Sequence, residues 1–371
     1  MSDETSERRV RRAIGLMSGT SMDGVDVALV ETDGEAIVRP GLTAFTPYPN
    51  ALRQLLRRAN AVALELDDRT ARPAPLAEAE AWVTQVQTAA VKAFASTFAE
   101  APDVVGFHGQ TVMHAPDRGM TIQLGDGAEM ASGLGIPVVY DLRAADVAAG
   151  GEGAPLVPVF HRALALQAGL EMPAAVLNIG GVANVTYVGA DGELIAFDTG
   201  PGNALIDDLM EARTGAPMDE GGERAAAGTV DRAIVDAYLA DPYFERSAPK
   251  SLDRGHFNRS LTDPLSLEDA SATLVAVTAE TIARGLKQLP AYPKRLVLGG
   301  GGLKNPVMMQ ALEAATGLEP ESADAFGWSA AFLEAQAFAY LAVRALDERA
   351  ITFPGTTGVA QPLTGGRIAR P

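Results

Sequence analysis

A strand–turn–strand pattern occurs twice in this sequence, and its repetition restricts the possible folds more than any other feature. The first copy spans residues 13–31 (AIGLMSGTSMDGVDVALVE), where two apolar, β-prone arms flank a turn of small and polar residues. The second spans residues 175–188 (AVLNIGGVANVTYV), where similar arms flank two glycines. In both halves a further strand and then a helix are expected. The pattern predicts a duplicated domain.

Helical and strand patterns alternate along the rest of the chain. Apolar residues recur at helical spacing in residues 48–70, 76–100, 267–289 and 329–344. Short apolar runs predict strands at 34–38, 104–107, 137–140, 194–197 and 295–298, whereas 144–156 is predicted to be a loop and 240–262 irregular. Polar or glycine-rich turns follow several strands, at the sheet edge where α/β proteins bind ligands. We therefore predict an α/β fold of two duplicated domains, residues 11–172 and 173–371, with mixed sheets flanked by helices and facing across a cleft. The alternative that the final helix packs back on the first domain stays open.

Length and composition narrow the class of protein. The 371 residues exceed one typical core, and 47% of them are hydrophobic, enough to bury two. The net charge of −17 argues against a nucleic-acid partner, which would need a basic surface. The absence of cysteine excludes disulfides, thiolate catalysis and Cys-ligated zinc, and suits a reducing compartment. No apolar stretch approaches membrane-spanning length, so we expect a cytoplasmic protein with no membrane partner.

The turn of the first repeat has the composition of a phosphate-binding loop. Its small residues leave backbone N–H groups accessible, and its hydroxyls add donors. Asp23 and Asp26 supply carboxylates for a Mg²⁺ ion carried on the phosphates. The alternative is an ordinary tight hairpin with a polar tip. The residues predicted to bind ATP here are Gly19, Thr20, Ser21, Met22, Asp23, Gly24, Val25 and Asp26.

Two glycine turns in the second half extend this prediction. The turn with Asn178, Gly180 and Gly181 suits the other side of a triphosphate. A run of four glycines at 299–302 lies between a predicted strand and a predicted helix, where backbone approaches a ligand closely and a helix N-terminus favours anions. A permissive β–α turn is the alternative. Gly299, Gly300, Gly301 and Asn305 are predicted to contact the nucleotide.

Asp198 is the candidate catalytic base. It is predicted at the C-terminal end of a strand and is followed by Thr-Gly-Pro-Gly-Asn, so that it could accept a proton from a water or hydroxyl. In phosphoryl transfer, one base together with donor loops and Mg²⁺ is a sufficient set of groups. The alternative is that Asp198 caps the helix that follows.

Four further side chains are candidates for substrate binding. Arg143 could clamp a carboxylate or phosphate, although a surface ion pair is the simpler interpretation. His108 and Gln110 follow a predicted strand and so lie at the ligand edge. Glu334 lies in a predicted helix with apolar neighbours and could be a buried site carboxylate, although the polar face of that helix is the simpler interpretation. The four histidines are too scattered for a zinc cluster, and neither a GxSxG elbow nor a Walker loop is present.

Taken together, several motifs closely resemble the anhydro-N-acetylmuramic acid kinase family. These are, in order, IGLMSGTSMDGVDVALVE, GFHGQTVMHAP, TIQLGDG, DLRAADVAAGGEGAPLVP, NIGGVANVT, FDTGPGN and FLEAQAFAYLA, spread from Ile14 to about Ala342. The resemblance implies a fold like that of actin, hexokinase and Hsp70. It also implies phosphorylation by ATP of O6 of 1,6-anhydro-N-acetylmuramic acid while water opens the 1,6-anhydro bridge, in cell-wall recycling.

The resemblance also assigns roles to residues. It implies that Asp198 activates the water and that residues 19–26 are the ATP signature. It implies that the first hairpin and residues 178–181 are the two phosphate loops and that the run at 299–302 is the adenosine-side loop. It also implies that Arg143 and Glu334 bind the sugar, with Arg143 on the lactyl carboxylate. It implies a homodimer. In one place the chain departs from the family, which often reads PKSTGRE where residues 249–255 read PKSLDRG.

Three other interpretations stay open at this point. A related kinase could act on another amino sugar. A catalytically silent regulator could bind ATP without turnover. An α/β scaffold that binds no nucleotide is the third.

Overall fold

The opening hairpin forms where the sequence predicts it. In the computed structural model, which describes residues 9–19 and 21–371, β1 (Arg11–Met17) pairs antiparallel with β2 (Gly24–Thr32), ending at Met17 opposite Asp26. Residues 13–16 are buried on both faces of the sheet, as their uninterrupted apolar run predicts.

The chain divides into two compact units. The first contains the described residues up to Gln167 together with Phe332–Pro371, and the second contains Ala168–Ala331. The predicted domains 11–172 and 173–371 differ from this division in that residues 168–172 group with the second unit. Residues 332–371 return to the first unit, so the alternative that the final helix packs back on the first domain is the one observed.

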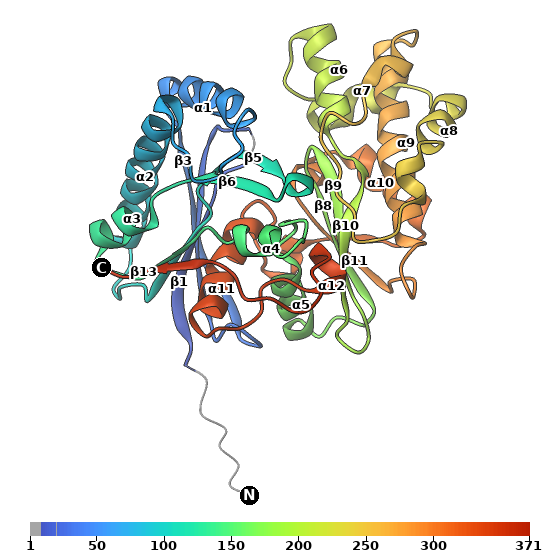
Figure 1. Ribbon diagram of the computed structural model, residues 1–371. Coiled ribbons are helices and arrows are strands. Elements are labelled where there is room, and N and C mark those ends of the chain that lie inside the picture. Colours follow the sequence, from blue (N-terminus) through green and yellow to red (C-terminus); the bar gives the residue numbers. More distant parts are fainter. Residues whose placement is uncertain (1–8, 20) are drawn as a thin grey trace, which may run out of the picture. The chain divides into compact units, whose positions relative to one another are not determined.

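Within its described residues, the first unit is built on a six-stranded sheet in the order β13-β7-β4-β1-β2-β3, with β5 and β6 forming a separate hairpin (Figure 1). Its remaining strands are β3 (Val38–Pro47), β4 (Val104–Phe107), β5 (Gln110–Ala115), β6 (Met120–Leu124), β7 (Val138–Tyr140) and β13 (Arg367–Ala369). Its helices are α1 (Asn50–Ala63), α2 (Ala74–Ala95), α3 (Gly127–Leu134), α4 (Ala144–Ala148), α5 (Pro158–Gln167), α11 (Leu333–Leu346), α12 (Pro354–Thr357) and the 3₁₀ turn η1 (Pro116–Arg118).

Two glycines allow α11 to lie directly on the first sheet. Gly15 of β1 and Gly106 of β4 are paired in register. A Cβ on Gly15 would lie 1.9 Å from the carbonyl oxygen of Ala335, and one on Gly106 would lie 2.0 Å from that of Phe338. The helix backbone therefore occupies the space that side chains of the central strands would need, and this packing brings Glu334 to the first unit.

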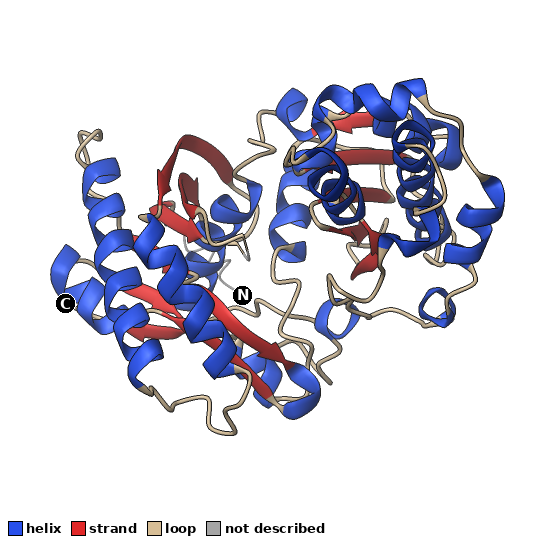
Figure 2. Ribbon diagram, turned by 90° about the horizontal axis from the view of Figure 1, so that it is seen from above, coloured by secondary structure: helices blue, strands red, loops and turns tan. Residues whose placement is uncertain are grey.

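Within its described residues, the second unit repeats the plan on a five-stranded sheet in the order β10-β9-β8-β11-β12, and Figure 2 shows its strands stacked between helices. Its strands are β8 (Ala174–Ile179), β9 (Val182–Val188), β10 (Leu194–Pro201), β11 (Arg295–Gly299) and β12 (Pro320–Ser322). Its α-helices are α6 (Ala204–Thr214), α7 (Glu223–Ala227), α8 (Arg232–Leu239), α9 (Leu267–Leu286) and α10 (Pro306–Thr316). Its 3₁₀ turns are η2 (Glu220–Gly222), η3 (Pro242–Glu245), η4 (Arg259–Thr262), η5 (Gly301–Lys304) and η6 (Ala323–Phe326).

The two sheets share one topology, which confirms the predicted duplication. In each, the first three strands form an antiparallel meander, and the fourth strand pairs parallel to the first on the opposite side. The predicted fold class, α/β with mixed sheets flanked by helices, is therefore the one observed.

Two local predictions were wrong. The third strand begins at Val38 rather than at residue 34, because the side chain of Asp33 accepts the N–H groups of residues 35–37 and holds them in a turn. Residues 144–148 form helix α4 instead of loop, since buried Asp146 accepts the N–H of Gly153 and the hydroxyl of Thr357. In the part of the chain that the structure describes, none of the helices combines the length and apolarity needed to cross a membrane.

Candidate functional site

Buried side chains hold the first turn in place. Ser18 Oγ lies 2.8 Å from the carbonyl oxygen of Gly24 and 2.6 Å from Gln110 Oε1. The Tyr48 hydroxyl donates to Ser18 Oγ (3.0 Å) and accepts from Gln87 Nε2 (2.6 Å). The Gln110 amide donates to the carbonyl of Gly19 (3.0 Å). Side chains from β5, α2 and the segment before α1 therefore fix both ends of the turn.

This network changes the interpretation of Gln110. Its side chain is fully buried and engaged with Ser18 and Gly19, so in this structure it supports the loop and does not face a substrate, contrary to the sequence-based expectation.

The turn itself is longer than a two-residue hairpin. Ser21 is exposed and donates to Asp23 (2.7 Å), while Met22 has a left-handed backbone with φ of 54°. Gly24 is buried at the start of β2, and the side chain of Val25 is in the core, so these two could meet a ligand only through backbone. Thr20 lies outside the described residues.

Three carboxylates influence one another beside this turn. Asp26 is half-buried, and burial raises its pKa to about 6, with further contributions from the charges of Asp23 and Glu334. Glu334 is exposed, yet the surrounding protein atoms raise the pKa of its carboxyl and Arg143 opposes this. A divalent cation beside Asp23 and Asp26 would relieve this repulsion, so the residues fit the predicted Mg²⁺. Among the described residues, no cluster of three or more acidic or histidine side chains has the arrangement of a metal site, so phosphate oxygens would have to complete the coordination.

His108 and Arg143 form a fixed pair. His108 Nδ1 donates to the carbonyl of Gly109 (2.9 Å), which leaves Nε2 as the acceptor facing Arg143 Nη2 at 3.2 Å. Burial, followed by the charge of Arg143, lowers the pKa of His108 to about 3, so the ring is neutral. Arg143 also donates to the carbonyl of Gly153 (2.9 Å). The surface ion pair considered for Arg143 is not what holds it: its guanidinium is half-buried and oriented by neutral acceptors.

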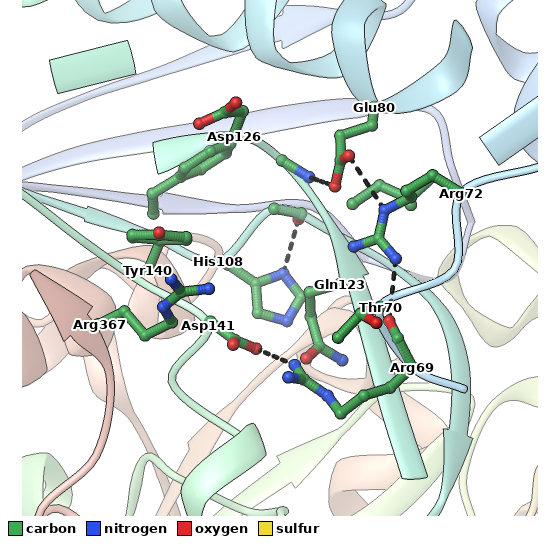
Figure 3. A pocket seen from close by; sticks show the side chains of 14 residues that line it. Arg69, Thr70, Arg72, Glu80, His108, Gln123, Asp126, Tyr140, Asp141 and Arg367 are labelled. Carbon is green, nitrogen blue, oxygen red and sulfur yellow. Dashed lines mark hydrogen bonds and ion pairs between the residues drawn. The ribbon is translucent and has the colours of Figure 1, made fainter. Parts of the chain in front are cut away.

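A pocket of about 290 Å³ has His108 among its lining residues (Figure 3). Its arginines are already engaged: Arg69 with Asp141 (2.5 Å), Arg72 with Glu80 (3.0 Å), and Arg367 over the ring of Tyr140 (5.4 Å). The arginines that line the pocket therefore already have partners within the protein. His108, which contacts Arg143, also lines this pocket.

In the second unit, one row of residues crosses the sheet. Asp198 of β10 pairs with Asn184 of β9, Asn184 with Asn178 of β8, and Asn178 with Gly299 of β11. Directly paired residues project from the same face of a sheet, so the three polar side chains lie side by side. All three are half-buried.

Asp198 is not in the position that the sequence indicated. Strand β10 continues to Pro201, and a β-bulge follows Asp198. The helix α6 begins after Asn203, so the alternative that Asp198 caps it is wrong. A half-buried carboxylate in mid-strand, next to two amides, is well placed to orient a small polar molecule.

Close backbone packing shapes the turns at the same sheet edge. The N–H of Asn203 donates to the carbonyl of Gly180 (2.7 Å), and that of Gly202 to the carbonyl of Gly181 (2.9 Å). A Cβ on Gly202 would lie 2.3 Å from the carbonyl oxygen of Gly180. Gly181 is exposed and Gly180 half-buried, so their backbone remains accessible.

The four-glycine run continues this edge. Gly299 is buried as the last residue of β11, and Gly300 has φ of 83°, where a Cβ would meet Asn178 Oδ1 at 2.4 Å. Gly301 is exposed and opens η5. Asn305 is buried and its side chain accepts from Val307 and Met308 N–H, so it is the N-cap of α10; its contact with the nucleotide stays a prediction.

Two contributors to the site lie outside the residues predicted for it. Asn184 belongs to the NIGGVANVT motif, and its spacing of six from Asn178 across a two-residue turn predicts the pairing. Residues 240–262 are predicted to be irregular, yet Tyr243, Lys250 and Leu252 in this segment contact Asp198. No local signal could have shown those contacts.

The chain is similar over nearly its whole length to proteins that are named as kinases. A protein of Rhizorhabdus wittichii named anhydro-N-acetylmuramic acid kinase is 56% identical over 97% of this chain and 99% of its own length. One of Methylobacterium nodulans with the same name is 53% identical over 97% and 100%. Among solved structures, component A of the Acidaminococcus fermentans (R)-2-hydroxyglutaryl-CoA dehydratase covers 90% of this chain and 98% of its own, at 13% identity and a TM-score of 0.47.

The protein is thus an α/β kinase built from two units of one topology. The family model for anhydro-N-acetylmuramic acid kinase matches residues 11–370. The chain belongs to the anhydro-N-acetylmuramic acid kinase family.

Proposed function

We propose that this kinase opens 1,6-anhydro-N-acetylmuramic acid with water and transfers the γ-phosphoryl group of ATP to O6, yielding N-acetylmuramic acid 6-phosphate and ADP in cell-wall recycling. The observation that carries the proposal is the row Asp198–Asn184–Asn178–Gly299, which joins a half-buried carboxylate to the glycine turns of one sheet edge in a chain of this family.

Asp198 acts as the general base. It accepts a proton from a water whose oxygen forms a bond to C1 of the sugar. The C1–O6 bond breaks, and O6 keeps the electron pair with which it attacks the γ-phosphorus while the bond to ADP breaks. A positioned carboxylate contributes about 10²- to 10⁴-fold to such a proton transfer. The polar amides of Asn184 and Asn178, on the same face as Asp198, are donors and acceptors that suit the water and the transferring oxygens.

The turns hold the phosphates of ATP. In the second unit, the accessible backbone of Gly180 and Gly181 supplies N–H donors, while Gly300 and Gly301 lie on the adenosine side of the nucleotide. In the first unit, the backbone of residues 19–24 does so, with the hydroxyl of Ser21. When bound, Mg²⁺ neutralises phosphate charge, and Asp23 and Asp26 are the residues that would hold it.

The sugar contacts come from Arg143 and Glu334. Arg143 is held by His108 and Gly153, so its orientation is set before ligand binds, which reduces the entropy lost when it clamps the lactyl carboxylate. Glu334 is exposed and accepts from sugar hydroxyls. His108 accepts from Arg143 and so helps to fix the orientation of its guanidinium. We further propose that the protein works as a homodimer in the cytoplasm, where its nucleotide substrate is found; sedimentation analysis tests the dimer.

The decisive experiment compares two sugars with ATP and Mg²⁺: the anhydro sugar and N-acetylmuramic acid, which is already open. Wild-type protein should convert the anhydro sugar to the 6-phosphate, and in ¹⁸O-labelled water the new C1 hydroxyl should carry the label while the phosphate does not. Phosphorylation of only the open sugar would indicate a different amino-sugar kinase. ATP binding without turnover of either sugar would indicate a regulator.

A further inference from the structure

The segment 243–252 contacts Asp198 at three points. The hydroxyl of Tyr243 donates to the backbone carbonyl of Asp198 at 2.6 Å. The N–H of Asp198 donates to the carbonyl of Lys250 at 3.0 Å. The N–H of Leu252 donates to the carboxylate oxygen Oδ2 at 2.7 Å. The segment thus holds both peptide groups of Asp198 and one oxygen of its side chain.

Lys250 closes the segment into a defined loop. Its side chain is 4% exposed, and its ammonium donates to the carbonyl of Arg246 (2.9 Å), to Gln288 Oε1 (3.0 Å) and to the carbonyl of Tyr243 (3.4 Å). It also lies 4.9 Å from the ring centroid of Tyr243. Burial, followed by the charges of Arg246 and Arg284, lowers the pKa of Lys250 to about 8, which leaves it mostly charged at neutral pH.

Asp198 needs such support because the sheet gives it little. β10 is the edge strand of its sheet, so only β9 pairs with it on one side. The bulge between Asp198 and Gly200 interrupts that pairing next to Asp198. At a bulged edge the strand is free to twist, and the direction of a side chain is then set by whatever covers the edge.

We infer that Tyr243 and Lys250 are positioning residues for Asp198, holding the loop that covers the edge of β10 and directing the carboxylate through the Leu252 amide. The inference rests on the proposed role of Asp198 as the base. Leu252 lies in the segment 249–255, where the chain departs from the family pattern. Because Leu252 contacts Asp198 through its backbone N–H, the changed side chain leaves this contact intact.

A matched pair of tyrosines tests the inference. Tyr243 and Tyr238 are both buried, and both donate at 2.6 Å to a backbone carbonyl, that of Asp198 and that of Asn258 respectively. Tyr243→Phe should lower kcat about tenfold with the KM for ATP unchanged, because misplacing a reacting group affects turnover more than binding. Tyr238→Phe should stay within about twofold of wild type while losing similar thermal stability. Lys250→Met keeps the buried aliphatic part of the side chain and removes its hydrogen-bond donors. It should lower kcat by more than Tyr243→Phe does.

Two controls separate failure of the inference from failure of the proposed function. If Asp198→Asn abolishes turnover but Tyr243→Phe and Tyr238→Phe behave alike, the positioning role is overturned and the base assignment stands. If Asp198→Asn turns over like wild type, the base assignment fails. In that case amide hydrogen exchange at Leu252 decides the remaining structural claim: faster exchange in Tyr243→Phe than in Tyr238→Phe supports it, and equal exchange overturns it.

Discussion

The turns that open the two sheets are held in place in different ways. The first turn is long, and buried side chains from three other segments hold it: Ser18, Tyr48, Gln87 and Gln110. The turn at Gly180 and Gly181 is short, and it is held by backbone bonds from residues 202–204, made possible by the missing side chain of Gly202. A long turn has conformational freedom that side-chain bonds must restrict, whereas a short turn needs mainly the absence of obstruction.

The acids beside the turns differ in the same way. Asp26 lies near two other carboxylates, Asp23 and Glu334, an arrangement that suits a cation. Asp198 receives a backbone N–H and lies next to neutral amides, an arrangement that suits proton transfer. Two units of one topology thus place their acidic side chains in different surroundings.

The largest expected effect on activity distinguishes Asp198 from Asp26. Asp198→Asn is expected to lower kcat by about 10²- to 10⁴-fold because it removes the proton acceptor and preserves the shape. Asp26→Asn should instead raise the Mg²⁺ concentration needed for half-maximal activity. Steady-state kinetics across a Mg²⁺ titration measure both, and the assignment of roles fails if the two variants show the same pattern.

The second-largest expected effect concerns the packing of α11 on the sheet of the first unit. Gly15→Ala places a Cβ against the backbone of α11, and overpacking of this severity should cost about 3 kcal/mol of unfolding free energy. Gly133→Ala, inside α3, meets only Thr88 at 3.4 Å and is the control, expected to be neutral or stabilising. Urea denaturation gives both values. Equal stability of the two variants would show that α11 moves away without cost.

A smaller effect tests the short turn. Gly202→Ala puts its Cβ 2.3 Å from a backbone oxygen, so the turn must shift, and we expect a loss of about 1–3 kcal/mol and a roughly tenfold higher KM for ATP. Gly301→Ala meets nothing closer than Asn203 at 3.6 Å, and Gly19→Ala in the first turn nothing closer than Ser21 at 3.8 Å. If either of these is as damaging as Gly202→Ala, steric exclusion is not what distinguishes the turns.

The smallest effect concerns pH. Burial and a neighbouring aspartate raise the pKa of Asp26 and of Asp207 to about 6 each. The folded state therefore binds more protons than the unfolded chain between about pH 4 and pH 6, so each group lowers stability as pH rises through that window. Because both are only half-buried, we expect each Asp→Asn variant to gain only about 1 kcal/mol at pH 7 and nothing near pH 4.

Mg²⁺ then distinguishes the two units. Added Mg²⁺ should remove the gain of Asp26→Asn, because the cation compensates the same repulsion, and leave that of Asp207→Asn unchanged. Thermal unfolding at pH 7 and 4, with and without Mg²⁺, gives the comparison. A Mg²⁺ response at Asp207 alone would contradict the proposed metal ligands.

Much of the fold was predictable because its signals are local. The alternation of apolar runs with turns gave both meanders, and the second copy of the pattern gave the duplication. The motifs that carry the family resemblance also lie within short stretches, so the glycine turns and Asp198 were identifiable as candidates. These local signals did not show the exact position of each residue in its strand. The sequence predicts Asp198 at the end of a strand, whereas β10 continues three residues beyond it.

Sequence alone determined which segments become strands and turns, since that depends on periodicity and on residues that tolerate tight backbone. Only the tertiary structure decided that α11 packs on Gly15 and Gly106, that Gln110 faces inward to hold a loop, and that Tyr243 contacts the edge strand. Each of these is a contact between surfaces distant in the chain. Such contacts depend on shape and on hydrogen-bond partners brought together by folding, and no local pattern encodes them.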